Sequence, residues 1–246
     1  MATAPAQAQA RLLDLQALDT RLHQIAHARA TIAERTQARD VHVQLEGAKD
    51  LLIAAQTEAS DITREQTRAE VDVEAVRSRI ERDQQRMDSG AVPAKELESI
   101  AHEIESLRKR QSDLEDIELE IMERLESAQA AAASHETRAM QLQQELADLQ
   151  ASVASQEADL DAQRDAAAAE RATVAADIPA DLLALYEKIR EGGGVGAAML
   201  QAKTCQGCRM TLPETEISRL RAVSEDSVER CDNCRCILVR TAESGL

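Results

Sequence analysis

All five cysteines of this 246-residue chain lie between positions 205 and 236, and four of them form two CxxC pairs. The pairs are Cys205-Gln206-Gly207-Cys208 and Cys231-Asp232-Asn233-Cys234, with 22 residues between them. Four thiolates complete the tetrahedral shell of Zn²⁺ and leave no position for water or substrate. The spacing therefore predicts one structural zinc ion held by Cys205, Cys208, Cys231 and Cys234. An iron–sulfur or redox role is the alternative, and the spacing disfavours it.

Two arginines and a fifth cysteine lie next to these ligands. Arg209 and Arg235 each follow the last cysteine of a pair, where we expect them to offset the negative charge of a four-thiolate zinc site. Gly207 and Asn233 suit the positive φ that such turns often need. Cys236 could compete with Cys234 for the metal, but CxxC geometry is better, so we expect a buried or free thiol.

Contact with phosphate is the other role open to these basic residues. It would use Arg209 and Arg235 together with further residues of the module: Lys203, Arg219, Arg221, Arg230 and Arg240. Against it, residues 195–246 hold seven Lys or Arg and seven Asp or Glu, so the module is neutral before the zinc site is counted. The module also has no aromatic residue on which a base could stack.

The rest of the chain has the composition of long helices. There is no Trp or Phe and a single Tyr, so the large side chains that fill compact cores are missing. The formal net charge of −16 falls on residues 1–194, which makes that part unsuited to nucleic acid. There is no secretion signal at the N-terminus and no apolar run of about 18 residues, so we expect a cytoplasmic protein that does not enter the membrane.

Two long helical arms flank a turn at residues 88–93. Gly90 and Pro93 supply a helix end and a helix start, and heptads of apolar residues run along both arms. In an antiparallel hairpin, the position numbers of facing residues add to a constant. Apolar pairs that add to between 180 and 182 can be found along both arms: Val73–Leu107, Val76–Ile104, Ile80–Ile100, Ile32–Leu149 and Leu22–Leu160. This register also predicts that Gly47 and Ala48 face Ala130–Ala133.

The predicted fold is mainly α, with a long antiparallel coiled-coil hairpin followed by a small C-terminal β zinc ribbon. We expect an N-terminal tail over 1–8, the hairpin over 9–176, a short helix and glycine-rich connector over 177–196, and the C4 ribbon over 197–246. Because the arms carry their own apolar seam, we expect zinc loss to leave them folded.

The chain resembles bacterial proteins that join a coiled-coil hairpin to a C4-type zinc ribbon. The resemblance rests on the turn from Ser89-Gly90 to Ala94-Lys95-Glu96-Leu97-Glu98, on Leu185-Tyr186-Glu187-Lys188-Ile189-Arg190, and on the two CxxC pairs. Arg235-Cys236 departs from the Gly-Arg that usually follows the last ligand. The resemblance implies a non-enzymatic adaptor whose protein partners belong to transcription or secretion systems, and some relatives are described as nucleic-acid binding.

Three classes of function can be compared on this basis. An enzyme is disfavoured, because the five histidines (His23, His27, His42, His102 and His135) all lie on the predicted arms, away from any closed pocket. A protein-binding adaptor is favoured, since long helical faces offer grooves to partners. Nucleic-acid binding through the ribbon is the alternative, and a monomer is favoured over a homodimer.

Overall fold

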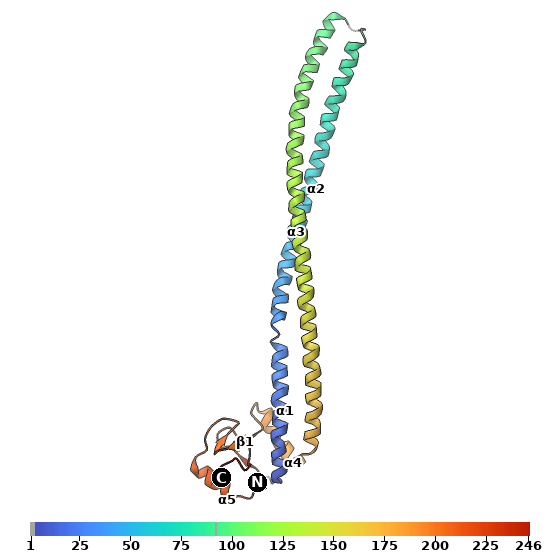
Figure 1. Cartoon of the computed structure of the whole chain (residues 1–246). Coiled ribbons are helices and arrows are strands. Elements are labelled where there is room, and N and C mark those ends of the chain that lie inside the picture. Colours follow the sequence, from blue (N-terminus) through green and yellow to red (C-terminus); the bar gives the residue numbers. More distant parts are fainter. Residues whose placement is uncertain (1–2, 92) are drawn as a thin grey trace. The chain divides into compact units, whose positions relative to one another are not determined.

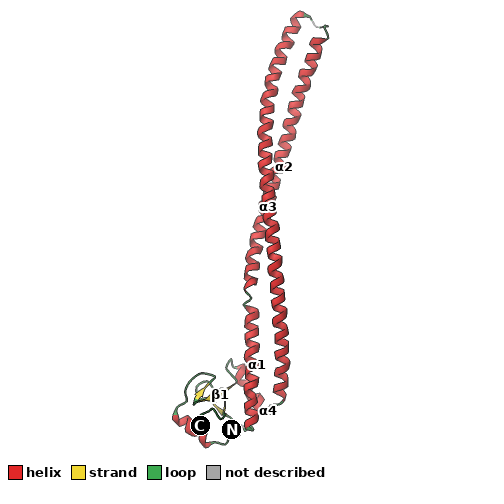
Figure 2. Cartoon of the chain, viewed as in Figure 1, coloured by secondary structure: helices red, strands yellow, loops and turns green. Residues whose placement is uncertain are grey.

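The computed structural model describes residues 3–91 and 93–246, and it confirms a mainly α chain with a small C-terminal sheet (Figures 1 and 2). Residues 1 and 2 of the predicted tail and residue 92 of the predicted turn lie outside the described residues. The elements in chain order are α1 (Ala6–Ala30), α2 (Ala33–Asp88), α3 (Ala94–Ala176), α4 (Ala180–Glu191), β1 (Ala197–Gln201), β2 (Thr204–Cys205), α5 (Glu214–Ala222), β3 (Glu229–Arg230) and β4 (Ile237–Val239).

The chain divides into two compact units, which we describe separately. The hairpin unit is Glu34–Ala151, and the ribbon unit combines Met1–Ala33 with Ser152–Leu246. None of the helices in the described part of the chain combines the length and the apolar character that a membrane crossing needs.

In the hairpin unit, α2 and α3 pair as an antiparallel coiled coil. Buried residues of α2 recur every seven positions, at Val41, Ala48, Ala55, Ile62 and Ala69. This is the spacing of a coiled-coil seam, and its many alanines keep the buried apolar area small. The ion pairs Glu65–Arg124, Arg77–Glu115 and Arg79–Glu103 cross between the two helices.

The arms pair in a register about one heptad away from the predicted one. The ion pairs Asp19–Arg171 and Arg29–Asp161 both join positions that add to 190, and Glu65–Arg124 adds to 189. Close to the turn the sums of the paired position numbers vary more: Arg79–Glu103 adds to 182 and Arg77–Glu115 adds to 192.

The predicted partners of Gly47 and Ala48 are wrong for the same reason. Ala48 packs in one cluster with Ala139 and Leu142, not with Ala130–Ala133. Sliding one arm by seven residues brings its apolar positions back to the seam, so the apolar pattern does not distinguish registers one heptad apart.

The first arm is interrupted at Thr31 and Ile32, where uninterrupted helix is predicted (Figure 2). The Thr31 hydroxyl donates a hydrogen bond of 2.8 Å to the carbonyl oxygen of His27. Two consecutive β-branched residues are poor helix formers, and a hydroxyl bonded to the preceding turn competes with the helical ladder. Helix α2 then continues through Gly47 without a break.

In the ribbon unit, a four-stranded sheet has the order β2-β1-β4-β3, and the side chains of β4 are buried on both of its faces. Strands β1 and β4 are parallel, and the two outer pairings are antiparallel. Side chains alternate between faces along a strand. Ile237 and Val239 therefore pack with residues of α1 and α4, while Leu238 packs in a second cluster with the cysteines and α5.

The N-terminal segment, predicted as a tail, packs against the ribbon. The amide of Ala4 donates a hydrogen bond of 2.8 Å to the carbonyl oxygen of Asp226, and Thr3 forms a β-bridge with Ser227. The buried Gln9 side-chain amide then donates to the carbonyl oxygens of Ala4 and Glu225. Both ends of the chain thus contribute to one folded unit.

Candidate metal centre

Four cysteine sulfurs converge in the ribbon unit. Cys205 and Cys208 come from β2 and the turn after it, and Cys231 and Cys234 come from the turn between β3 and β4. Their four Sγ atoms all lie within 4.8 Å of one another. In the described part of the chain, no other set of histidine, cysteine or acidic side chains gathers in this way. The histidine pair His23 and His27 therefore forms no such cluster.

The sulfur positions fit a tetrahedral zinc ion. The Sγ atoms of Cys205 and Cys234 are 3.8 Å apart, and those of Cys208 and Cys231 are 3.9 Å apart. A tetrahedron with Zn–S bonds of about 2.3 Å has edges of about 3.8 Å. Four protein donors fill the coordination shell of one structural zinc ion, whose chemistry is to hold the two CxxC turns together.

The two CxxC turns share one backbone design. In each, the backbone amide of the residue that follows the second cysteine donates a hydrogen bond to the carbonyl oxygen of the first cysteine. Arg209 donates to Cys205 at 2.7 Å, and Arg235 donates to Cys231 at 2.9 Å. The amides of Cys205 and Cys231 donate in turn to the carbonyl oxygens of Met210 and Cys236, both at 3.0 Å. The fold therefore presents both pairs of sulfurs through the same hydrogen bonds.

The left-handed residues of these turns are not the predicted ones. Arg209 and Arg235 have φ of 58° and 67°, whereas Gly207 and Asn233 do not adopt positive φ. Gly207 is needed for space instead, because a Cβ there would lie 3.1 Å from Cβ of Ala198 and 3.3 Å from Sγ of Cys236.

The ligand thiols differ in their acidity. Burial raises the pKa of Cys231 to about 12 and also raises that of Cys205. A hydrogen bond from the Asn233 side chain lowers the pKa of Cys208 to about 7. Because zinc binds thiolates, loading the site releases protons, and acidification opposes it.

Five of the seven predicted contact residues are held within the ribbon unit. Arg219 pairs with Glu229 at 2.9 Å, and Lys203 and Arg221 both pair with Glu214. Arg230 donates to the carbonyl oxygen of Arg235. The Arg240 guanidinium donates to five backbone oxygens: those of Leu220, Val223, Ser224, Glu225 and Ser227.

Arg209 and Arg235 are different from the other five. Within residues 3–91 and 93–246, neither guanidinium has an ion pair or a side-chain hydrogen bond. Their charges remain available to offset the zinc–thiolate site or to meet a partner.

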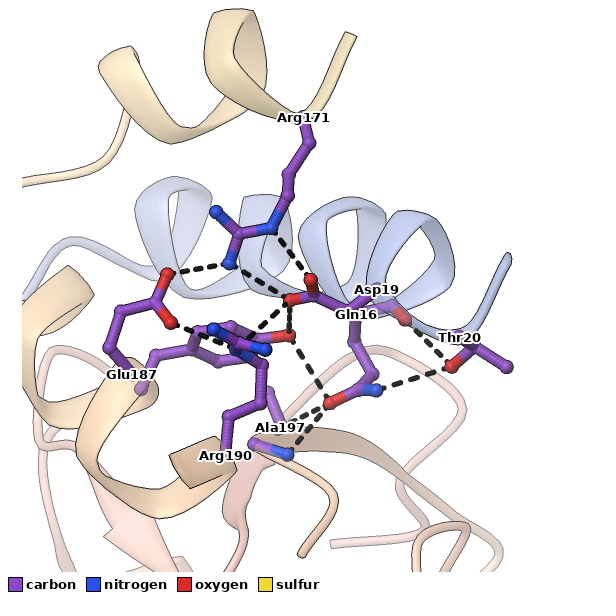
Figure 3. Close-up of polar contacts among 9 residues, drawn as sticks. Gln16, Asp19, Thr20, Arg171, Glu187, Arg190 and Ala197 are labelled. Carbon is purple, nitrogen blue, oxygen red and sulfur yellow. Dashed lines mark hydrogen bonds and ion pairs between the residues drawn. The ribbon is translucent and has the colours of Figure 1, made fainter. Parts of the chain in front are cut away.

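A buried polar network, which sequence reasoning missed, connects three helices of the ribbon unit (Figure 3). Asp19 of α1, whose side chain is 8% exposed, accepts hydrogen bonds from Arg171 of α3 at 2.6 Å and from the Tyr186 hydroxyl at 2.7 Å. Arg171 also pairs with Glu187 of α4 at 2.5 Å. Burial opposes ionisation of Asp19, but the hydrogen bonds from Arg171 and Tyr186 outweigh it and hold the pKa of the carboxyl below its usual value.

The same network reaches the first strand of the ribbon. The Gln16 side-chain oxygen accepts hydrogen bonds from the backbone amides of Gly196 at 2.7 Å and Ala197 at 3.3 Å (Figure 3). The one available signal was a lone tyrosine followed by Glu187 and Arg190 in a chain without other aromatic residues. That pattern does not identify Asp19 and Arg171, which are far away in the sequence.

Comparisons with known proteins agree with this architecture. A family model for the CT398-like coiled coil hairpin domain matches residues 15–194, and a model for the C4-type zinc ribbon domain matches residues 204–238. An uncharacterized protein of Mycobacterium tuberculosis is 37% identical over 233 residues, which is 94% of this chain and 95% of that protein. An uncharacterized protein of Mycobacterium leprae is 28% identical over 211 residues, 86% of this chain and 91% of its own length.

Two solved structures share the fold. A protein from Mycobacterium smegmatis has a TM-score of 0.80 at 34% identity, covering 97% of this chain and 100% of that one. CT398 from Chlamydia trachomatis has a TM-score of 0.59 at 12% identity, with 96% and 98% covered, and shows the likeness of the fold alone. The chain belongs to the family of CT398-like coiled-coil hairpin proteins and ends in a C4-type zinc ribbon.

Proposed function

We propose that this protein is a non-catalytic adaptor that binds other proteins through the outer faces of its hairpin unit. The coiled coil and the closed zinc site fit a structural protein, and nothing in the two matched families points to catalysis. The zinc ribbon serves as a compact end domain. Four thiolate ligands and a reduced Cys236 fit a reducing compartment, and we place the adaptor in the cytoplasm.

Exposed apolar side chains on the hairpin unit carry this proposal. Of the large hydrophobic residues that are exposed in the described chain, most lie on α2 and α3 between 43 and 140: Val43, Leu51, Ile53, Val71, Ile117, Leu119, Met122 and Met140. Val43 and Val71 are four heptads apart, and Leu119 and Met140 are three heptads apart. Each of these two pairs therefore shares one face of its helix, away from the seam.

Side chains this exposed bury little apolar area within the hairpin itself. Val43 and Val71 are 67% and 63% exposed, so their burial by a partner would remove apolar surface from water. We call the four residues Val43, Val71, Leu119 and Met140 the outer apolar set.

The ribbon gives less support to nucleic-acid binding, the alternative function. Five of its seven predicted contact residues already have partners inside the chain. The net charge of −16 falls on residues 1–194 and does not favour nucleic acid there either. Arg209 and Arg235 are the two residues through which a phosphate contact would be made.

Substitution of the outer apolar set by glutamine tests the proposal. Glutamine keeps helix propensity, so the variant retains its fold while losing apolar contacts. Tagged full-length protein would be used to capture partners from a nuclease-treated lysate of the source cells, with quantitative mass spectrometry. We expect about tenfold less of the partner proteins, which corresponds to about 1.4 kcal/mol of binding free energy.

Two control variants separate the possible outcomes. Met210→Gln changes an exposed apolar residue of the ribbon and should leave capture unchanged. Arg209→Gln with Arg235→Gln should also leave it unchanged. Partners that are captured only from lysate without nuclease, and that are lost in this arginine variant alone, would replace the adaptor proposal with nucleic-acid binding.

A further inference from the structure

Cys236, the fifth cysteine, lies directly against the zinc site. Its side chain is fully buried, and its Sγ atom is 3.3 Å from Sγ of Cys234 and 3.6 Å from Sγ of Cys205. Both distances are as short as the edges of the ligand tetrahedron itself. The side chain therefore adjoins one edge of the ligand set, formed by Cys205 and Cys234.

The backbone around Cys236 is fixed by the same turn that presents the ligands. Its carbonyl oxygen accepts the hydrogen bond from the amide of Cys231, and the next residue, Ile237, begins β4. Gly207 of the opposite CxxC turn leaves room for the Cys236 sulfur, since a Cβ there would lie 3.3 Å from it. The fold thus accommodates a fifth sulfur beside the four ligands.

The ligand closest to Cys236 is also one of the two that solvent reaches. Cys205 and Cys231 are fully buried, whereas Cys208 and Cys234 are partly exposed. An exposed thiolate ligand is the one that a solvent-borne reagent meets first. A buried sulfur 3.3 Å behind it is placed to take over its position on the metal.

We propose that Cys236 is a reserve zinc ligand that replaces Cys234 when Cys234 leaves the ion. The exchanged set is Cys205, Cys208, Cys231 and Cys236, which again supplies four thiolates once the Cys236 side chain turns toward the ion, since its sulfur lies outside the group whose atoms are all within 4.8 Å of one another. The Cys236 thiol gives up its proton as its sulfur binds zinc, and the departing Cys234 thiolate takes up a proton. The charge of the site is unchanged, and a free thiol faces solvent while the ribbon keeps its metal.

Cobalt substitution of single-cysteine variants tests this exchange in the full-length protein. Co²⁺ reports the number of thiolate ligands through the intensity of its sulfur charge-transfer bands. In Cys234→Ser we expect one Co²⁺ per chain with the spectrum of four thiolates, and zinc affinity within about tenfold of the parent. In the double variant Cys234→Ser with Cys236→Ser we expect a three-thiolate spectrum and a further loss of more than about tenfold in zinc affinity.

Cys208→Ser is the matched control. Cys208 is the other partly exposed ligand and contacts Cys231 at 3.9 Å, on the edge opposite Cys236. This variant should give a three-thiolate spectrum although Cys236 is present, and Cys236→Ser alone should keep four thiolates. If Cys234→Ser matches the double variant in spectrum and affinity, the proposal is wrong.

The test remains decisive for a variant that loses the ribbon fold. A Cys234→Ser protein that binds no metal while Cys236→Ser binds normally would also contradict a reserve ligand. The proposal depends on the zinc site and is independent of the adaptor function, so either can fail without the other.

Discussion

Single residues decide how the ribbon is joined to the helices of its own unit. Gly196 precedes β1, and a Cβ at this position would lie 2.7 Å from Cδ2 of the Tyr186 ring. Tyr186 is fully buried and bonded to Asp19, so its ring has no room to move aside. Glycine is needed here because of this close approach.

Replacing Gly196 with alanine should therefore destabilise the ribbon unit. Overpacking of this kind costs about 1–3 kcal/mol. Near-ultraviolet circular dichroism during chemical denaturation would follow the unfolding of the ribbon unit, because Tyr186 is the only Phe, Tyr or Trp in the chain and its signal reports on this unit alone. Gly47→Ala is the control, since nothing lies within 4 Å of its added Cβ and alanine favours helix. Equal stability of Gly196→Ala and the parent would contradict the tight contact with Tyr186.

The metal ligands could be predicted from residues alone, whereas the polar network could not. Two CxxC pairs can be recognised as metal ligands from the local sequence, because a four-thiolate shell needs only that the fold bring the two pairs together. Asp19 and Arg171 each look like ordinary surface residues of an acidic coiled coil. Their burial depends on α4 and the ribbon packing beside them, which no local pattern records.

At the scale of elements, apolar periodicity predicted the helices better than their register. The heptads of α2 and α3 identify two paired arms, and the structure confirms them. The ion pair between Arg29 and Asp161 marks which positions face each other in the structure, whereas apolar positions repeat with every heptad and leave the register open. The break at Thr31 was missed, since a threonine in a long polar helix carries no strong local signal.

Zinc removal should affect the two units differently. In the ribbon unit, Ile237 and Val239 of the zinc-bearing sheet pack against Leu12 and Leu15 of α1. The hairpin unit has its own core of Val41, Leu45, Ala48, Ala139 and Leu142. The expectation that zinc loss leaves the arms folded therefore applies to the hairpin unit, whereas α1, the start of the first arm, and α4 lose a packing partner.

Hydrogen exchange with mass spectrometry would measure this difference before and after treatment with a chelator. We expect protection to fall over 197–246 and, less strongly, over α1 and α4, while 34–151 keeps its protection. Renewed addition of zinc should restore the parent pattern. A cooperative loss of protection throughout 34–151 would show that the hairpin unit depends on the metal.

At the scale of the whole molecule, charge and apolar surface point to the same class of partner. The neutral ribbon contributes nothing to the net charge of −16, which falls on the residues before it. This distribution opposes long-range attraction of nucleic acid to the helices. The outer apolar set lies within that acidic part, so it suits proteins that bury apolar side chains and tolerate or complement acidic surroundings.

The most direct test of the adaptor function is site-specific photo-crosslinking in living source cells. A photoreactive amino acid would replace Val71 or Leu119 in one set of proteins and Arg209 or Arg235 in another. We expect crosslinks from Val71 or Leu119 to join the chain to distinct partner proteins, and expect them to resist nuclease. Crosslinks to nucleic acid from Arg209 or Arg235, with none to protein from Val71 or Leu119, would contradict the account.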